Sequence, residues 1–392
     1  MNPIRISAYT MTSALGAGRA SHARALIEEK SGLSRCSPDF CALDCWVGEV
    51  KGLDKPLQGE WAPWDCRNHR LAALALRQDG FDQTVKSLIS RHGAERVALF
   101  VGTSTSGIRH TELAFSARDP ASNRLPGWFD FECTQSTFAA AEFVATYLGI
   151  RGVRAVLATA CSSSAKVFAS AHRAIATGLC DAAVVGGVDS LCLMTLHGFH
   201  SLQLIAPQPC RPADAKRNGI SIGEAAGFAI LEPNEPVDLG LLGYGETNDA
   251  YHMSSPEPAG RGAAAAMRAA LARARLAPDE LDYVNLHGTA TPANDLAEDR
   301  AVAAVLGTEL PCSSTKGWTG HALGAAGILE AALSLLCVEE GFLPRSLNTG
   351  EKDPALSCHI LLEGMRRPIQ RVMSNSFGFG GSNCALILGR PA

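Results

Sequence analysis

The sequence is poor in charged and aromatic residues. Only 19% of its 392 residues are Asp, Glu, Lys or Arg, only 6% are Phe, Trp or Tyr, and the formal net charge is −4. Because the chain has no basic excess and no basic patch, we expect no nucleic-acid partner. The 46% of hydrophobic residues also excludes a disordered chain and is typical of a compact soluble enzyme.

Export and membrane signals are absent as well. Residues 1–6 show no charged segment leading into an apolar run, and no stretch reaches the length of a membrane span. The 13 cysteines are an odd number without the tight, even spacing of a secreted disulfide scaffold. We therefore expect free thiols in a cytoplasmic protein with no membrane partner.

Cys36, Cys41 and Cys45 lack a Cys-x-x-Cys pair and a matching histidine group, so we interpret them as structural and predict no metal ligands there.

The chain is long enough for two fused halves, since 392 residues exceed the length at which a single core usually stops growing. Apolar runs such as 95–101 alternate with helical patterns up to the strand before Cys161 and beyond it. This order predicts right-handed crossovers and a parallel sheet in an α/β protein. Residues 233–236 form a break that contains Pro and Glu, and after it the alternation of strand and helix patterns repeats. We predict an N-terminal half at 1–236 and a C-terminal half at 237–392.

One cysteine lies where a strand is expected to end. The apolar run 153–158 leads into Thr159-Ala160-Cys161-Ser162-Ser163-Ser164, and a helical pattern begins at Ser162. At a helix N-terminus, unpaired N–H groups and the positive end of the dipole favour the thiolate over the thiol. Cys161 is therefore a candidate activated nucleophile, and a buried structural thiol is the alternative.

Two histidines occupy comparable turns in the second half. His287 follows an apolar strand, and His321 lies in a glycine-rich turn before the apolar helix 322–338. A single histidine is more often structural than catalytic. In open α/β sheets, however, sites form at the carboxyl ends of strands, where Cys161, both histidines and the turn 377–381 all fall. We predict that these residues converge on one pocket.

Four motifs carry a resemblance to a known family. They read Thr-Ala-Cys161-Ser-Ser-Ser, His287-Gly-Thr-Ala-Thr-Pro, Ser-Ser-Thr-Lys316-Gly-Trp-Thr-Gly-His321-Ala-Leu-Gly-Ala-Ala-Gly and Asn375-Ser-Phe-Gly-Phe379-Gly-Gly. With these motifs in this order, the chain resembles the β-ketoacyl-acyl carrier protein synthases of the elongating Cys-His-His type, most closely from about residue 90 onward. The resemblance implies an α/β protein with a duplicated thiolase-like fold, layered α-β-α-β-α with two mixed sheets.

The resemblance also implies a reaction, the decarboxylative Claisen condensation of an acyl thioester with malonyl-acyl carrier protein. The product is β-ketoacyl-acyl carrier protein, in fatty acid or specialised polyene or polyketide elongation. Cys161 would hold the acyl chain, while His287 and His321 would promote the loss of carbon dioxide from malonate. A His321 kept neutral by a helix N-terminus could donate a hydrogen bond to the developing enolate. The backbone N–H groups of Cys161 and Phe379 resemble the family's oxyanion hole.

Further residues match supporting positions of the family. Lys316 and Glu298 match a charged pair near the histidines, with Lys316 as catalytic support and a purely structural ion pair as the alternative. Thr289 and Thr291 match positions that hydrogen-bond the phosphopantetheine arm. Positions that line or gate the acyl pocket are matched by Ile108, Phe199 and Phe379.

No resident cofactor is expected from the resemblance, because the phosphopantetheine arm arrives on the carrier protein. The family often binds a structural monovalent cation near the positions of Glu330 and Asn375, and this alternative stays open. The implied partner is acyl carrier protein, loaded with an acyl or a malonyl group. The resemblance further implies a homodimer, with a heterodimer containing a chain-length-factor-like subunit as the alternative.

Two stretches depart from the family pattern. Residues 8–13 lack the usual Thr-Gly-x-Gly turn, and residues 109–135, which help to form the dimer surface and the acyl pocket, match poorly. A dedicated pathway such as polyene pigment synthesis is one interpretation. The rivals are a thiolase or initiating synthase, against which His321 argues, and a non-catalytic chain-length partner, against which Cys161 argues. The acyl length, the starter group and the carrier protein stay open.

Overall fold

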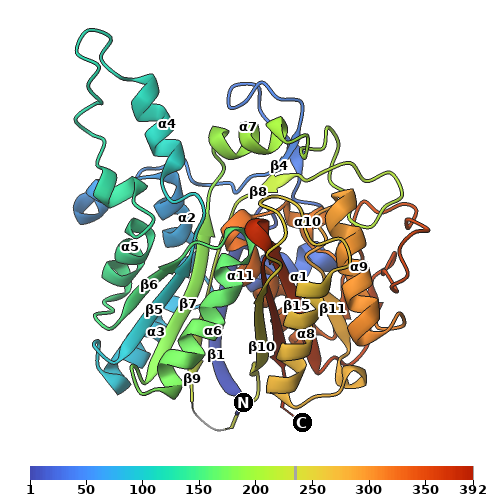
Figure 1. The fold of residues 1–392 in the computed structure, drawn as a ribbon. Helices are drawn as coiled ribbons and strands as arrows, with labels where there is room; N and C mark the ends of the chain where they lie inside the picture. Colours follow the sequence, from blue (N-terminus) through green and yellow to red (C-terminus); the bar gives the residue numbers. More distant parts are fainter. Residues whose placement is uncertain (234–235, 392) are drawn as a thin grey trace.

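The computed structural model describes residues 1–233 and 236–391 (Figure 1). Through them runs a mixed sheet of eleven strands, ten of which form one continuous path. The N-terminal strands of this path are, in order, β6 (Arg154–Leu157), β5 (Val97–Gly102), β7 (Ala182–Asp189), β9 (Ala225–Glu232) and β1 (Ile4–Ser13). The C-terminal strands follow as β10 (Gly240–Asn248), β16 (Ser382–Gly389), β15 (Arg371–Gly378), β11 (Tyr283–Asn285) and β12 (Cys312–Ser313).

The two sets of strands mirror each other. In each set the two outer pairs are parallel and the two inner pairs antiparallel. The duplicated fold with two mixed sheets is therefore confirmed. The two sheets are joined into one path because β1 and β10 pair over two positions, Ile4 with Leu241 and Arg5 with Gly240.

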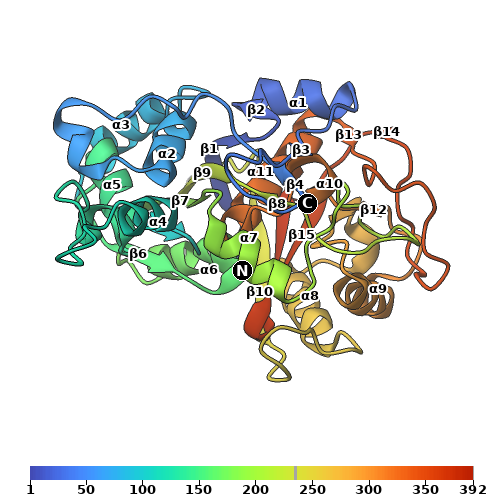
Figure 2. The ribbon, with the colours of Figure 1, turned by 90° about the horizontal axis from the view of Figure 1, so that it is seen from above.

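Helices cover both sheets and fill the space between them. The outer face of the N-terminal sheet is covered by α2 (Arg67–Leu76), α3 (Phe81–His92) and α5 (Ala139–Leu148). The outer face of the C-terminal sheet is covered by α8 (Arg261–Ala274) and α9 (Pro292–Leu306). Between the sheets lie α6 (Ser163–Ala176) and α11 (Ala326–Glu340), and Figure 2 shows α11 at the centre of the molecule.

The side chains of each strand point alternately to the two faces of its sheet, so the two sheets lie between three apolar layers. In β7, Val184 packs against α2 and α5, whereas the next residue, Val185, packs into the middle layer. The two middle helices are in close contact, since a Cβ on Gly327 of α11 would lie 2.4 Å from the backbone nitrogen of Ala165 in α6. A bulkier residue than glycine at this position would push the helices apart.

Three segments lie outside the layers. Figure 1 shows α4 (Ile108–Ser116) projecting from the body, with the loop that follows and a short π-helical turn, Phe131–Gln135. The stretch 36–66 contains β4 (Trp46–Gly48) and the 3₁₀ helix η1 (Gly59–Trp64). Near it β3 (Ser34–Arg35), β4 and β8 (Ile222–Gly223) form a small sheet. Smaller elements complete the described chain: β2 (Gly16–Ala17), α1 (Arg19–Ile27), α7 (Leu193–Ser201), α10 (Lys316–Thr319), β13 (Phe342–Leu343) and β14 (Met365–Arg366).

The prediction of free thiols is confirmed for all 13 cysteines, and Cys36, Cys41 and Cys45 are buried in one apolar cluster. The first strand, β1, extends to Ser13, because its later residues pair with β9. Residues 234–235 of the expected break lie outside the described residues, and the division at residue 236 stays a prediction. Among the described residues, no helix combines the length and apolar character needed to cross a membrane.

Candidate active site

Cys161 lies at the junction predicted from the sequence. A single turn, η3 (Ala160–Ser162), separates β6 from α6 and carries the thiol. Ala160 has a φ of 52°, a left-handed conformation that is strained for a residue with a side chain. Gly102 lets β5 approach the start of α6, since a Cβ there would lie 2.4 Å from the Ser164 nitrogen. The thiol is thereby held in a tight turn with 6% exposure.

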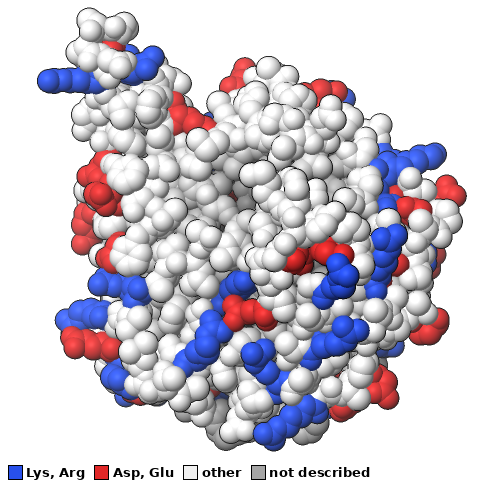
Figure 3. Space-filling model, in the orientation of Figure 1, with Lys and Arg blue, Asp and Glu red and all other residues white. Residues whose placement is uncertain are grey.

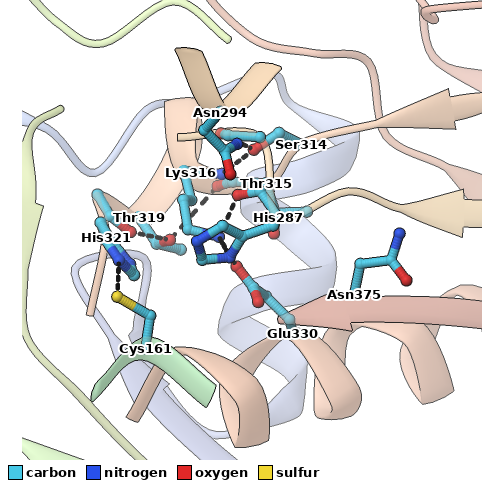
Figure 4. Close-up of polar contacts among 12 residues, drawn as sticks. Cys161, His287, Asn294, Ser314, Thr315, Lys316, Thr319, His321, Glu330 and Asn375 are labelled. Atoms are coloured by element: carbon cyan, nitrogen blue, oxygen red, sulfur yellow. Dashed lines mark hydrogen bonds and ion pairs between the residues drawn. The ribbon is translucent and has the colours of Figure 1, made fainter. Parts of the chain in front are cut away.

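His321 is the direct neighbour of the thiol. It lies between α10 and the turn η5 (Leu323–Ala325), and its Nε2 is 3.0 Å from Cys161 Sγ (Figure 4). Burial, assisted by the charge of Lys316, lowers the pKa of His321 well below its usual value. This lowered pKa favours the predicted neutral state, and its main cause is desolvation by burial.

His287 completes a buried group of three. Its ring centroid is 5.3 Å from that of His321, with 84° between the ring planes. Cys161 Sγ and one nitrogen of each ring lie within 4.8 Å of one another. The Nζ of Lys316 is 3.4 Å from His287 Nδ1. Since an ammonium only donates, Nδ1 accepts, and a neutral His287 carries its proton on Nε2. Burial lowers the pKa of His287 well below its usual value, which favours this neutral form.

Lys316 has a different acidic partner from the one predicted. Its Nζ forms an ion pair with Glu330 on α11 and donates a hydrogen bond to the carbonyl oxygen of His287. Glu298 on α9 instead accepts hydrogen bonds from the backbone N–H groups of His287 and Gly288, both at 2.8 Å. The predicted Lys316–Glu298 pair is therefore wrong, because the backbone of the His287 turn already satisfies the Glu298 carboxylate. Glu298 holds that turn in place.

The thiol of Cys161 is not preformed as a thiolate. Burial raises its pKa to about 11, although the charge of Lys316 and the backbone N–H of Phe379 oppose the shift. The prediction of a thiolate favoured by the helix N-terminus is therefore wrong for the free protein, because desolvation of the sulfur has a larger effect than the Lys316 charge and the nearby N–H groups. The Nε2 of His321 is placed to accept the proton when the thiol reacts.

The two backbone donors expected to form an oxyanion hole both oppose the rise in the pKa of the Cys161 thiol. They are the N–H groups of Cys161 and of Phe379, the first residue of the turn η6 (Phe379–Gly381). Gly378 lets the two segments approach each other, since a Cβ there would lie 2.9 Å from Thr159 O and 3.2 Å from the Cys161 nitrogen. Their catalytic role stays a prediction.

A cavity of about 270 Å³ lies against Cys161 and both histidines. Figure 3 shows a hollow in this face of the molecule, and few charged side chains surround the hollow. Thr289 and Thr291 line the cavity, with their hydroxyl oxygens 2.9 Å apart. Phe199 and Phe379 also line it, and their ring centroids are 5.5 Å apart. Ile108, the first residue of α4, is not among the described lining residues, and its role in an acyl pocket stays a prediction.

The predicted turn 377–381 reaches the cavity, and the ring centroid of Phe377 lies 6.0 Å from that of His287. Sequence reasoning missed other residues that line the cavity, namely Asn294 and residues 254–256. No sequence signal indicated the latter stretch, because it is a loop without a recognisable motif that reaches the site only through the fold.

Two domain families match the sequence. Residues 69–236 match the family described as beta-ketoacyl synthase, N-terminal domain, and residues 240–350 match beta-ketoacyl synthase, C-terminal domain. The 3-oxoacyl-[acyl-carrier-protein] synthase 2 of Staphylococcus aureus is 30% identical over 377 residues, which cover 86% of this chain and 93% of the relative. The mitochondrial 3-oxoacyl-[acyl-carrier-protein] synthase of Arabidopsis thaliana is 37% identical over 261 residues, covering 61% of this chain and 57% of the relative.

Solved structures share the whole fold. A ketosynthase (ApeO) in complex with its chain length factor (ApeC) from Xenorhabdus doucetiae matches with a TM-score of 0.91 and 39% identity, over 99% of this chain and 98% of the other. A beta-ketoacyl synthase from Burkholderia phymatum matches with a TM-score of 0.86 and 27% identity over 100% of both chains. The fold and the Cys-His-His site define a thiolase-like condensing enzyme. Within that class, the chain belongs to the β-ketoacyl synthase family.

Proposed function

We propose that the chain is a β-ketoacyl-acyl carrier protein synthase, which condenses an acyl thioester on Cys161 with malonyl-acyl carrier protein. One observation carries the proposal: the two halves of the chain bring Cys161, His287 and His321 within 4.8 Å of one another beside a cavity of about 270 Å³. Membership in the β-ketoacyl synthase family supports the same reaction.

In the first half-reaction an acyl group passes from the carrier protein to Cys161. The thiol stays protonated until the thioester arrives, and His321 Nε2, 3.0 Å from Sγ, takes its proton. The Sγ–carbon bond forms, the bond from the acyl carbon to the pantetheine sulfur breaks, and the proton passes on to the leaving thiolate. The N–H groups of Cys161 and Phe379 stabilise the negative oxygen of the tetrahedral intermediate.

In the second half-reaction malonyl-acyl carrier protein loses carbon dioxide. The electron pair of the broken bond moves toward the thioester oxygen, where neutral His287 donates from Nε2. Neutral His321 supplies a second donor in the tautomer that carries its proton on Nε2, the reverse of the tautomer that accepts the thiol proton in the first half-reaction. The resulting carbanion attacks the acyl carbon on Cys161, the bond from that carbon to Sγ breaks, and the thiolate takes up one proton from solvent. Lys316 supports His287 by fixing the tautomer that can donate.

The carrier-protein arm needs a polar path to this site. The hydroxyls of Thr289 and Thr291 line the cavity and support the proposal that they bind the phosphopantetheine arm. The arm is part of the substrate, so the proposed reaction uses no resident cofactor. The 13 free thiols support the further proposal that the protein works in a reducing cytoplasm.

Glu330 and Asn375 fit the structural cation that the family resemblance implies. Glu330 Oε2 and Asn375 Oδ1 are buried and have no hydrogen-bond partner among the described residues. Carboxylate and amide oxygens are typical ligands of hard cations, so these two atoms would hold the ion. The cation would supply positive charge beside the buried carboxylate, and no step of the reaction depends on it.

An unpaired sheet edge and an apolar arm support association with a second subunit. Strand β6 pairs only with β5 in the described structure and leaves one edge open. The arm around α4 exposes large apolar side chains, each between 51% and 55% exposed: Leu113, Phe115, Trp128 and Phe131. Both features are unfavourable in water and are commonly covered by a partner.

We propose a chain-length-factor-like subunit as that partner, with a homodimer as the alternative. The supporting observation is that ApeO, 39% identical to this chain, was solved in complex with its chain length factor. The ishigamide ketosynthase/chain length factor also matches, with a TM-score of 0.87 and 25% identity. Such a pair would serve a specialised acyl or polyene product. Native mass spectrometry of the protein alone and after co-expression distinguishes the two assemblies.

The two half-reactions test the proposed function separately. Cys161→Ala should abolish condensation but leave carbon dioxide release from malonyl-acyl carrier protein measurable, since the histidines remain. His321→Ala should lower carbon dioxide release about a hundredfold, because one donor to the enolate is lost. It should still accept an acyl group on Cys161, more slowly because the proton acceptor is gone.

Cys180→Ala is the matched control, because Cys180 is also buried and free but lies beyond the far end of α6. It should retain both half-reactions. Carbon dioxide release at the wild-type rate in His321→Ala would contradict the proposed role of this histidine. An acyl group found by peptide mapping chiefly on another cysteine would contradict the assignment of Cys161.

A further inference from the structure

A lysine on α6 lies beside both turns of the oxyanion hole and has no part in the reaction described above. Lys166 Nζ donates a hydrogen bond to Ser382 Oγ at 2.7 Å, and Ser162 Oγ donates to the same oxygen at 3.3 Å. Ser162 follows Cys161, and Ser382 follows the turn η6. One serine hydroxyl thus joins the segment that carries Cys161 to the segment that carries Phe379.

Lys166 has no competing acidic partner. Within residues 1–233 and 236–391 no carboxylate forms an ion pair with its ammonium group, and its side chain is partly buried. The charge is therefore directed at a neutral hydroxyl. A hydrogen bond with one charged partner is roughly twice as strong as a neutral one, so the contact with Ser382 is a firm attachment.

The turn η6 depends on contacts of this kind because glycines surround Phe379. Gly380 has a φ of 78°, and such a residue gives the backbone little stiffness of its own. The outer side of the turn is attached by Asn248 Nδ2, which donates to Gly380 O at 3.0 Å, and by the Gly380 N–H, which donates to Met253 O at 2.8 Å. On the side that faces α6, Ser382 supplies the corresponding attachment.

We propose that Lys166, acting through Ser382, is a positioning residue for the oxyanion hole. It holds the Phe379 N–H at the separation from the Cys161 N–H that a tetrahedral thioester intermediate requires. This inference rests on the proposed function. The effect of Lys166 is confined to acyl transfer and condensation, in which negative charge develops on the acyl oxygen. Decarboxylation of malonate places charge on an enolate that faces the histidines instead.

Four variants separate positioning from general stability. Lys166→Met removes the ammonium and keeps an apolar stem, Lys166→Arg keeps the charge and the donor, and Ser382→Ala removes the acceptor. Lys86→Met is the matched control, since Lys86 is an exposed lysine on α3. For each variant, acyl transfer from octanoyl-acyl carrier protein is followed by intact mass, and decarboxylation by carbon dioxide release from malonyl-acyl carrier protein. Thermal unfolding is recorded beside both.

Lys166→Met should lower kcat for acyl transfer about tenfold with KM unchanged, because a small displacement of an oxyanion donor is costly. Carbon dioxide release should stay within about twofold of wild type, as in Lys86→Met. Lys166→Arg should restore most of the lost rate. Ser382→Ala should reproduce the loss. A double variant that combines Lys166→Met with Ser382→Ala should be no slower than either single variant, since both changes remove the same contact.

Acyl transfer at the wild-type rate in Lys166→Met overturns the inference. An equal loss in both half-reactions, accompanied by a lower melting temperature, also overturns it, because that pattern marks a purely structural contact. If Lys166→Met does not fold, the smaller change Ser382→Ala decides the question by the same two measurements. If the wild-type protein accepts no acyl group and releases no carbon dioxide, the proposed function itself fails, and the inference falls with it.

Discussion

Iodoacetamide alkylation of Cys161 should rise steeply with pH and reach no plateau below about pH 10. Because burial raises the pKa of this thiol to about 11, each pH unit below that value should change the thiolate fraction about tenfold. Near pH 8 about one Cys161 side chain in a thousand is then a thiolate, against about one in four for a cysteine with an unperturbed pKa of about 8.5. The rate should therefore be about 200-fold below that of a free thiol.

The assay quenches aliquots of the alkylation reaction across the pH range and measures the modified Cys161 peptide by mass spectrometry. N-acetylcysteine in the same tube serves as the unperturbed reference. A plateau near neutral pH would refute the reasoning, since it would show that His321 already holds the proton in the free protein. His321→Ala should keep the steep dependence, because burial and not this histidine is the main cause of the raised pKa.

Glu330→Gln leaves the Lys316 ammonium buried without its carboxylate, so the free energy of unfolding should fall by about 3–5 kcal/mol in urea titrations. An unchanged titration midpoint would show that this ion pair is dispensable. Ile108→Phe should shorten the acyl chains found in the products by mass spectrometry, because an overfilled apolar pocket repacks poorly; an unaltered product profile would remove Ile108 from the pocket. Trp128→Asp on the exposed arm should weaken association with the second subunit about tenfold or more in analytical ultracentrifugation. Unchanged association would place the interface elsewhere.

The reactive groups could be located from the sequence because their positions depend on local patterns. The apolar run that becomes β6 and the helical pattern that becomes α6 place Cys161 at a strand end before any tertiary contact is known. His287 follows β11 in the same way. The alternation of strands and helices likewise predicts the parallel pairs of the sheet, since crossovers have one preferred hand.

The charged surroundings of these groups could not be predicted in the same way. Glu298 and Glu330 both lie on helices near Lys316 in sequence, and the choice between them depends on how α9 and α11 pack. The pKa of Cys161 depends on how completely residues of both halves exclude water, which no local pattern records. Glu330 still had one overlooked signal, because a carboxylate in the middle of the apolar run 322–338 favours a buried cation beside it.

The contact between α6 and α11 restricts how such a protein can be recombined. Cys161 lies two residues before α6, and His321 lies two residues before the turn that leads into α11, so the packing of these two helices sets the distance between sulfur and imidazole. The Ile328 N–H of α11 donates to Ser164 Oγ of α6 at 2.9 Å, directly behind the thiol. A chimera with the second half of a distant homologue would bring a foreign α11 surface into this contact. Its chemistry should fail even where each parental enzyme is active.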